Sequence, residues 1–465
     1  MSSRKIIFFV IVGLVGFILL YGIWNISQAR KTNKAATTET LTLWVVGNTT
    51  QQYETLFSGF QAFAPEYKNT SLDIRVFPDY DGYQKVLLST LAEGNGPDIF
   101  MIEWGGDSIL ESQTVPIPES FLWLSGFEKE YEDIFLPLLK SEWSGKSIVR
   151  SLIGVPIGYE TLGIFYHKSL IRSLPKTWAE VETLDIPSDR GPIYPINLWL
   201  GPAYTPDAVD LIAYFMGKSG WRSTKDLSSG ASGLDDYLAY GTNPVTPSGE
   251  NTDTPTSSLQ DEKDLMTADK LSTVDLFIRG KIAMLIGFPS LIRELEKAEK
   301  RWAGDALGDL ILTAPLPSDS AGKNRGVLAR YRYLGISKKT QNPDASAKLL
   351  QYIMSDVGST KSLEAFPLLL SPKRSLVNTQ WTTPLSDVFA RTRLDAFIPA
   401  LQDDIFFFQY DIKGEYTRIL RDYIDRNEKV DINNLIKTIQ NDISCLVETR
   451  ENGAVSEKCS GSNEW

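Results

Sequence analysis

The stretch that decides the fold is Gly154–Trp178, GVPIGYETLGIFYHKSLIRSLPKTW. Val155–Ile157 is expected to be extended, because Pro156 disfavours the helical region for the residue before it. The apolar run Leu162–Tyr166 has the length and the β-forming side chains of a strand buried on both faces. A loop is predicted between them, at Gly158–Thr161.

This predicted loop carries the first candidate site residues. Gly158 is followed by Tyr159 and Glu160, so a flexible position precedes an aromatic ring and a carboxylate. That order suits a ligand-facing loop. The alternative is an ordinary loop with a solvated Glu160, and these residues alone leave both open.

Length and charge limit the class of protein. A chain of 465 residues with 42% hydrophobic residues is long enough for two or three packed domains. The formal net charge of -11 and the pI near 4.9 argue against nucleic acid as a partner, because neutralising phosphates requires clustered Lys and Arg.

Few side chains for catalysis or metal binding are present. His167 is the only histidine, and Cys445 and Cys459 are the only cysteines. Histidine-based triads and transition-metal sites are therefore disfavoured, and we expect no cofactor. A carboxylate-based glycosidase stays open, although a chain with 58 acidic residues offers many carboxylate pairs.

The N-terminus predicts a membrane anchor. Ile6–Trp24 contains 19 residues without a charge, which suffices for a transmembrane helix. A removable signal peptide is the alternative, but its apolar core is shorter and ends at a small-residue cleavage site. We expect the span to be retained, with Lys31–Thr40 as a flexible tether.

The expected orientation of the span in the membrane rests on the length of the body that follows it more than on the flanking charges. Three basic residues follow the span and two precede it, so the positive-inside rule leans weakly toward a cytoplasmic body. Long domains translocate largely regardless of flanking charge, and we place the body outside the cytoplasm. There Cys445 and Cys459 would form a disulfide, or else stay as two thiols.

The first part of the body predicts a parallel sheet. Strand patterns at Leu41–Val46, Leu72–Phe77 and Ile99–Ile102 alternate with helical patterns at Gln52–Ala64 and Tyr83–Ala92. This βαβαβ order predicts strands wrapped by helices.

Open α/β sheets bind ligands beyond the carboxyl ends of their strands. That rule selects residues after the first and third strands, namely Asn48, Thr49, Glu103, Trp104 and Asp107.

The rest of the body is more varied. Pro192–Pro206 is rich in proline and aromatics, so Tyr194, Trp199 and Tyr204 are expected on strand ends and loops. Gly217–Lys270, with a helical island at Leu234–Tyr240, could be a disordered insertion, but we prefer a surface loop region of the second domain. The later pattern predicts helices and strands at Ser272–Phe277, Ile282–Ile286, Ile311–Thr313, Tyr333–Ile336 and Asp344–Met354, and helices after Asp411.

Six segments in order carry a family resemblance. They are Leu41–Tyr67, Gly96–Leu110, Gly154–Leu170, Pro175–Glu180 (PKTWAE), Leu276–Pro289 (LFIRGKIAMLIGFP) and Tyr333–Asp356. Together they resemble the extracellular solute-binding proteins of ABC importers, family 1, of the type that includes maltose-binding protein.

The resemblance implies an α/β, two-lobed periplasmic-binding-protein-like fold with several interlobe crossovers, here preceded by one N-terminal transmembrane helix. The implied division is residues 1–40 as anchor and tether, 41–153 with 322–368 as N-lobe, 154–321 with 369–450 as C-lobe, and 451–465 as tail.

The resemblance also implies ligand-facing residues around an interlobe cleft. They are Asn48, Thr49, Glu103, Trp104, Tyr159, Glu160, Trp199, Tyr204, Phe288, Arg330 and Tyr331. Tyr159, Trp104, Trp199 and Phe288 would suit stacking on sugar rings, with core positions for two or three of them as the alternative. His167 is interpreted as structural.

The leading hypothesis is a non-enzymatic, membrane-anchored extracytoplasmic protein that captures a polar solute, a sugar or oligosaccharide, for an ABC permease. We expect a single-pass protein of the cell membrane that is a monomer. The alternatives are a tethered ligand-sensing or interaction module and, less favoured, the glycosidase.

Overall fold

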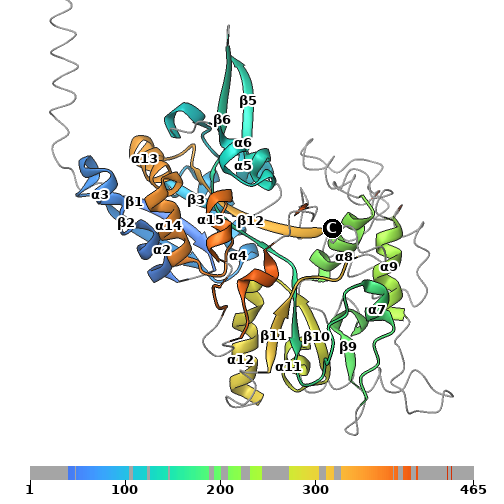
Figure 1. The fold of residues 1–465 in the computed structure, drawn as a ribbon. Helices are drawn as coiled ribbons and strands as arrows, with labels where there is room; N and C mark the ends of the chain where they lie inside the picture. Colours follow the sequence, from blue (N-terminus) through green and yellow to red (C-terminus); the bar gives the residue numbers. More distant parts are fainter. Residues whose placement is uncertain are drawn as a thin grey trace, which may run out of the picture.

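The computed structural model places two α/β lobes side by side, joined by strands that cross between them (Figure 1). The described residues are 40–47, 49–103, 108–122, 126–144, 147–187, 193–200, 208–220, 231–242, 272–302, 310–318, 326–380, 382–385, 391–398 and 405–406, with Lys437 and Asn441. The predicted span Ile6–Trp24, its tether, and Cys445 and Cys459 lie outside them.

The first lobe begins with the predicted parallel unit. Strand β1 (Thr40–Val46) pairs in parallel with β2 (Ser71–Phe77) and with β3 (Ile99–Glu103). Buried apolar side chains along β1 and β3 explain why these runs form central strands. The βαβαβ prediction is therefore confirmed, and its connecting helices are α2 (Thr50–Phe57), α3 (Phe60–Phe63) and α4 (Tyr80–Ala92).

The predicted helix Gln52–Ala64 is broken near Gly59. A Cβ at Gly59 would lie 2.6 Å from the hydroxyl oxygen of Tyr352. That hydroxyl donates to the carbonyl of Leu56 at 3.0 Å. The close packing of Tyr352 accompanies the break, and the periodicity of the segment alone does not reveal it.

A strand from far along the chain completes the first sheet. β12 (Val327–Ile336) lies antiparallel to β3 and to β7 (Val155–Thr161), and pairs in parallel with β13 (Ile405–Phe406). The strand order is β13-β12-β3-β1-β2, with β7 also pairing β12. Helices α13 (Pro343–Met354) and α14 (Asp356–Ala365) follow β12 and pack on this lobe.

The predicted loop at Gly158–Thr161 is wrong. These residues belong to β7, which is buried along its whole length and pairs with β12. The register shifts between Arg332 and Tyr333, so the strand continues through an irregularity. At Gly158 a Cβ would lie 2.8 Å from that of Leu369. Glycine at position 158 therefore allows the close approach of Leu369 to the strand. It does not mark a flexible loop.

The second lobe contains a four-stranded sheet. Its order is β11 (Ile311–Ala314), β8 (Gly163–His167), β10 (Ile282–Gly287) and β9 (Tyr194–Ile196). This confirms the strands predicted at Leu162–Tyr166, Ile282–Ile286 and Ile311–Thr313. The helices of this lobe are α7 (Trp178–Glu182), α8 (Ala208–Lys218), α9 (Ala231–Thr242), α11 (Thr273–Ile278) and α12 (Ile292–Trp302).

His167 is a buried structural residue at the end of β8. Its Nε2 lies 2.6 Å from the carbonyl oxygen of Phe277, and the two rings are 4.5 Å apart. Burial lowers the pKa of His167, and the bond to Phe277 only partly opposes that effect. The structural interpretation is confirmed, although the side chain lies in the interior.

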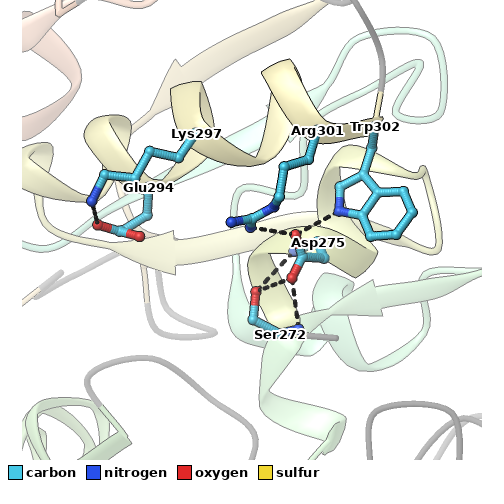
Figure 2. Close-up of polar contacts among 6 residues, drawn as sticks. All are labelled: Ser272, Asp275, Glu294, Lys297, Arg301 and Trp302. Carbon is cyan, nitrogen blue, oxygen red and sulfur yellow. Dashed lines mark hydrogen bonds and ion pairs between the residues drawn. The ribbon is translucent and has the colours of Figure 1, made fainter. Parts of the chain in front are cut away.

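Asp275 joins α11 to α12 (Figure 2). Its carboxylate accepts hydrogen bonds from the backbone N–H and the hydroxyl of Ser272, at 2.8 and 2.7 Å. It also accepts from Arg301 Nη2 at 2.6 Å and from Trp302 Nε1 at 2.7 Å. The capping box at the start of α11 thus also holds the end of α12.

A hairpin without a counterpart in the sequence prediction extends from the first lobe (Figure 1). It consists of β5 (Leu139–Ser144) and β6 (Ser147–Leu152), with β4 (Ile117–Pro118) beside the base of β6. Arg150 bonds Glu119 at 3.0 Å and Glu128 at 2.5 Å. The remaining short helices are α5 (Ser108–Ser112), α6 (Phe127–Glu130) and α15 (Arg374–Val377).

Candidate functional site

The candidate site lies on one face of the crossover strand β12. Successive side chains of a strand point to opposite faces. Arg330 and Arg332 are 16% and 19% exposed, whereas Ala329, Tyr331 and Tyr333 between and beside them are buried. One face of β12 therefore presents two arginines to the region where the lobes meet.

Arg332 belongs to the first-lobe half of this face. Its Nη2 lies 2.8 Å from Oε1 of Glu103, the last residue of β3, which pairs with Arg332 in the strand register. Gly47, just after β1, has φ +63° and lies beside the same guanidinium. The carboxyl ends of β1 and β3 thus meet at Arg332, as the strand-end rule predicts.

Arg330 belongs to the second-lobe half. Its Nε donates to Glu160 Oε2 at 3.1 Å, and its Nη2 donates to the hydroxyl of Ser290 at 2.8 Å. Ser290 lies in the 3₁₀ turn Pro289–Leu291, directly after β10, and its backbone N–H donates to Glu160 Oε1 at 2.8 Å. These three residues close a ring of hydrogen bonds between β7, β12 and the second lobe.

Two further residues hold the Arg330 guanidinium. Its central carbon lies 3.8 Å from the ring centroid of Phe288, a cation–π contact. Its Nη1 lies 3.9 Å from Asp210 Oδ2, which α8 supplies from the second lobe. Arg330 is therefore fixed by side chains from several elements of the second lobe and from β7.

Glu160 is ionised in this setting. Burial raises the pKa of its carboxyl, but the charges of Arg330 and Arg332 and the bonds from Ser290 outweigh burial and lower that pKa. With only 2% of its side chain exposed, Glu160 is an internal counter-ion in this conformation.

Three aromatic residues of the predicted set are core residues here. Tyr159 is 1% exposed, Phe288 is 0% exposed and Tyr331 is 3% exposed. Phe135 contacts the rings of both Tyr159 and Tyr331 edge-on, at 5.8 and 5.1 Å. Neighbouring side chains cover these three rings in this structure, and their contact with a ligand stays a prediction.

Thr49 caps a helix in this structure, and its predicted contact with a ligand stays a prediction. Its hydroxyl accepts from the backbone N–H of Gln52, and Gln52 Oε1 accepts from the N–H of Thr49 at 3.0 Å. Thr49 is the N-cap of α2 and is exposed. Its hydroxyl is engaged by the helix it starts.

Four predicted residues, Asn48, Trp104, Asp107 and Tyr204, lie outside the described residues. Trp199 lies in the 3₁₀ helix Asn197–Leu200, and its side chain is outside the description. Their roles stay predictions.

Sequence reasoning missed Asp210, Ser290 and Arg332. Arg332 had a usable signal, because it follows Arg330 by two residues in a strand and must share its face. No sequence signal pointed to Asp210 or Ser290, because only the tertiary fold brings these two residues to Arg330.

Other described features give no competing site. A groove of about 290 Å³ on the first lobe is lined by residues such as Phe57, Phe60, Leu72 and Ile74, and by none of the predicted site residues. Among the described residues, no cluster of three or more His, Cys, Asp or Glu side chains could hold a metal. None of the described helices has the length and hydropathy to cross a bilayer.

Solved structures share this fold. The sugar-binding protein MalE of Xanthomonas citri is 19% identical with a TM-score of 0.62, covering 89% of this chain and 98% of its own. An ABC substrate-binding protein of Listeria monocytogenes, in complex with cycloalternan, is 12% identical with a TM-score of 0.59, covering 90% and 100%. The GacH receptor of Streptomyces glaucescens, solved unliganded and with acarbose, is 18% identical with a TM-score of 0.58, covering 89% and 99%.

At these identities the structural likeness shows the fold alone. No curated protein sequence matches the chain. The family model for bacterial extracellular solute-binding proteins matches residues 51–359, well over half of the chain. The two-lobed architecture, the crossover strands and this match agree, and the chain belongs to the bacterial extracellular solute-binding protein family.

Proposed function

We propose that this protein is a membrane-anchored, extracytoplasmic solute-binding protein that captures a sugar or oligosaccharide between its lobes and delivers it to an ABC permease. Family membership supports the class. Proteins of the same fold support the ligand type, because they include the sugar-binding protein MalE and receptors solved with cycloalternan and with acarbose.

The observation that carries the proposal is the charged face of β12. Arg330 and Arg332 each hold a carboxylate partner and stay partly exposed where the two lobes meet. Such fixed donors and acceptors suit a polyhydroxylated ligand, since orienting groups in advance lowers the entropy lost on binding. Glu103 and Arg332 would contact the ligand from the first lobe, with Asn48, Trp104, Trp199 and Tyr204 proposed to complete the site.

Glycoside hydrolysis is a weaker fit. A general acid must hold a proton at working pH, which requires a raised pKa. The pKa of Glu160 is lowered, with Arg330 as its closest charge. Glu160 is therefore suited to be a counter-ion.

The anchor is the second part of the proposal. Ile6–Trp24 is long enough to span a bilayer and is followed by a poor cleavage context. N-terminal sequencing of protein extracted from membranes tests this directly. A mature chain that starts near residue 30 would contradict it.

A thermal-melt screen of the full chain tests the binding function. The detergent should be an amine oxide, because maltoside head groups are themselves saccharides. Maltotetraose, cycloalternan, acarbose and uncharged monosaccharides form the panel, with amino acids as matched polar controls. A saccharide at 100 times its dissociation constant adds about 2.7 kcal/mol to the free energy of unfolding. If no saccharide raises the melting temperature while an amino acid does, the sugar assignment is wrong.

A further inference from the structure

We propose that Arg330, and not Glu160, presents the ligand contact at the crossover, and that Glu160, Ser290 and Phe288 are positioning residues that hold its guanidinium. The inference rests on the proposed function and names the residue that sets its specificity. It reverses the role that the sequence prediction gave to Glu160.

Both carboxylate oxygens of Glu160 are already engaged. Oε1 accepts from the backbone N–H of Ser290 at 2.8 Å, and Oε2 accepts from Arg330 Nε at 3.1 Å. Only 2% of the Glu160 side chain is exposed, so a ligand hydroxyl cannot approach its remaining lone pairs without moving these partners aside. Separating a buried carboxylate from its donors is unfavourable in an interior of low dielectric.

Arg330 has the opposite character. Glu160 fixes its Nε, the Ser290 hydroxyl fixes its Nη2, and the Phe288 ring supports its face at 3.8 Å. The side chain nonetheless keeps 16% of its surface exposed on the same strand face as Arg332. A planar fork that is held in place and still accessible is suited to two oxygens on neighbouring ligand atoms.

The local charge indicates which oxygens these are. The two arginines are accompanied by three carboxylates, Glu103, Glu160 and Asp210. The cluster therefore carries no excess positive charge that would attract an acidic ligand. A neutral pair of vicinal hydroxyl groups on a saccharide fits this setting better than the carboxylate of a uronic acid.

Calorimetric titration of the full chain with maltotetraose, cycloalternan and trigalacturonic acid tests the inference. We expect the wild type to bind a neutral probe and to discriminate against trigalacturonic acid. Arg330→Met should weaken neutral-probe binding at least tenfold, and Arg330→Lys should weaken it less. Arg301→Met is the matched control, because Arg301 pairs with Asp275 on the outside of α12 and should leave affinity unchanged.

The positioning role has its own readout. Glu160→Gln should weaken neutral-probe binding about threefold through Arg330, and should have no further effect when added to Arg330→Met. If Glu160 acted on binding independently of Arg330, the losses of affinity caused by the two substitutions would add in the double variant. The double variant removes both charges of the Glu160–Arg330 pair, so no ionised Glu160 is left without its arginine, and the test stays valid if Arg330→Met folds poorly.

The outcomes separate the two proposals. A wild type that binds none of the three saccharides overturns the proposed function and this inference with it. A wild type that binds a neutral probe, with Arg330→Met binding equally well or more tightly, overturns the inference alone. Preference for trigalacturonic acid overturns the neutral-ligand assignment.

Discussion

Glu160 and Asp275 are both buried carboxylates bonded to an arginine and to a backbone N–H, yet the chain surrounds them differently. Asp275 bonds Ser272, three residues before it, and Arg301, whose side chain is 54% exposed. Glu160 bonds Arg330, which is 16% exposed and 170 residues away. Water can take the place of Asp275 beside the largely exposed Arg301, whereas only 16% of the Arg330 side chain is in contact with water. The same pair of charges therefore has different energetic consequences at the two places.

The largest expected effect is that of Glu160→Ala. The change leaves the Arg330 guanidinium in a largely buried position without its main counter-ion, and we expect a loss of about 3 kcal/mol in the free energy of unfolding. Urea denaturation of the full chain measures it. A loss under about 1 kcal/mol would show that Arg330 reaches solvent readily, and the contrast with Asp275 would fail.

Asp275→Ala should have a smaller effect, about 1–2 kcal/mol. It removes the capping box of α11 and the acceptor for Arg301 and Trp302, but both partners keep access to water. The control is Glu294→Ala, because the Lys297–Glu294 pair in the same helix α12 is solvent-exposed (Figure 2) and should contribute close to zero. A loss for Asp275→Ala as large as that for Glu160→Ala would contradict the comparison.

Acidic pH provides a gradual form of the same test. At Glu160 and Asp275 burial raises the pKa, but bonds and charges from their partners outweigh it, so the pKa of each is lowered on folding. A lowered pKa gives stability that is present above the unfolded pKa, about 4.3 for Glu and 3.9 for Asp, and that is lost as pH falls through the folded pKa.

The stability difference between wild type and Glu160→Gln should therefore shrink as pH falls below about 4.3. Urea melts between pH 3 and pH 6 measure it. Subtracting the variant removes the contribution of His167, which acts on both proteins alike. A difference that stays constant through this range would mean that the pKa of Glu160 does not change on folding.

The smallest expected effect is that of Arg301→Ala. Because Arg301 is largely exposed, its ion pair should contribute less than about 1 kcal/mol and should weaken as salt is added. Thermal melts at low and high salt measure it. A larger, salt-independent loss would show that the Arg301–Asp275 pair behaves as a buried pair.

The same comparison explains what could be predicted from the sequence. The Ser272–Asp275 cap lies in four consecutive residues, and the helix at this place was predicted from residues 272–277. The strands β1, β2, β3 and β10 were also predictable, because their apolar patterns are local. Local sequence patterns therefore predicted individual helices and strands.

The site around Glu160 depends on contacts that no local pattern encodes. Gly158–Thr161 has the composition of a loop, and only pairing with β12 makes it a strand. Tyr159 and Phe288 have the chemistry of ligand-stacking rings, and only Phe135 and Arg330 reveal that they are covered. The family resemblance identified Glu160 and Arg330 as neighbours of the site, but it did not show that they pair with each other.

The position of β12 in the chain also constrains the order of folding. β3 and β7 flank β12 in the first lobe, yet β12 follows nearly all of the described second lobe in the sequence. During synthesis the first sheet keeps an open edge on β3 until residue 336 has emerged, and an open edge invites pairing with other chains. Contacts of such long sequence separation also slow folding. Until β12 inserts, a chaperone that shields strand edges has a long interval in which to act.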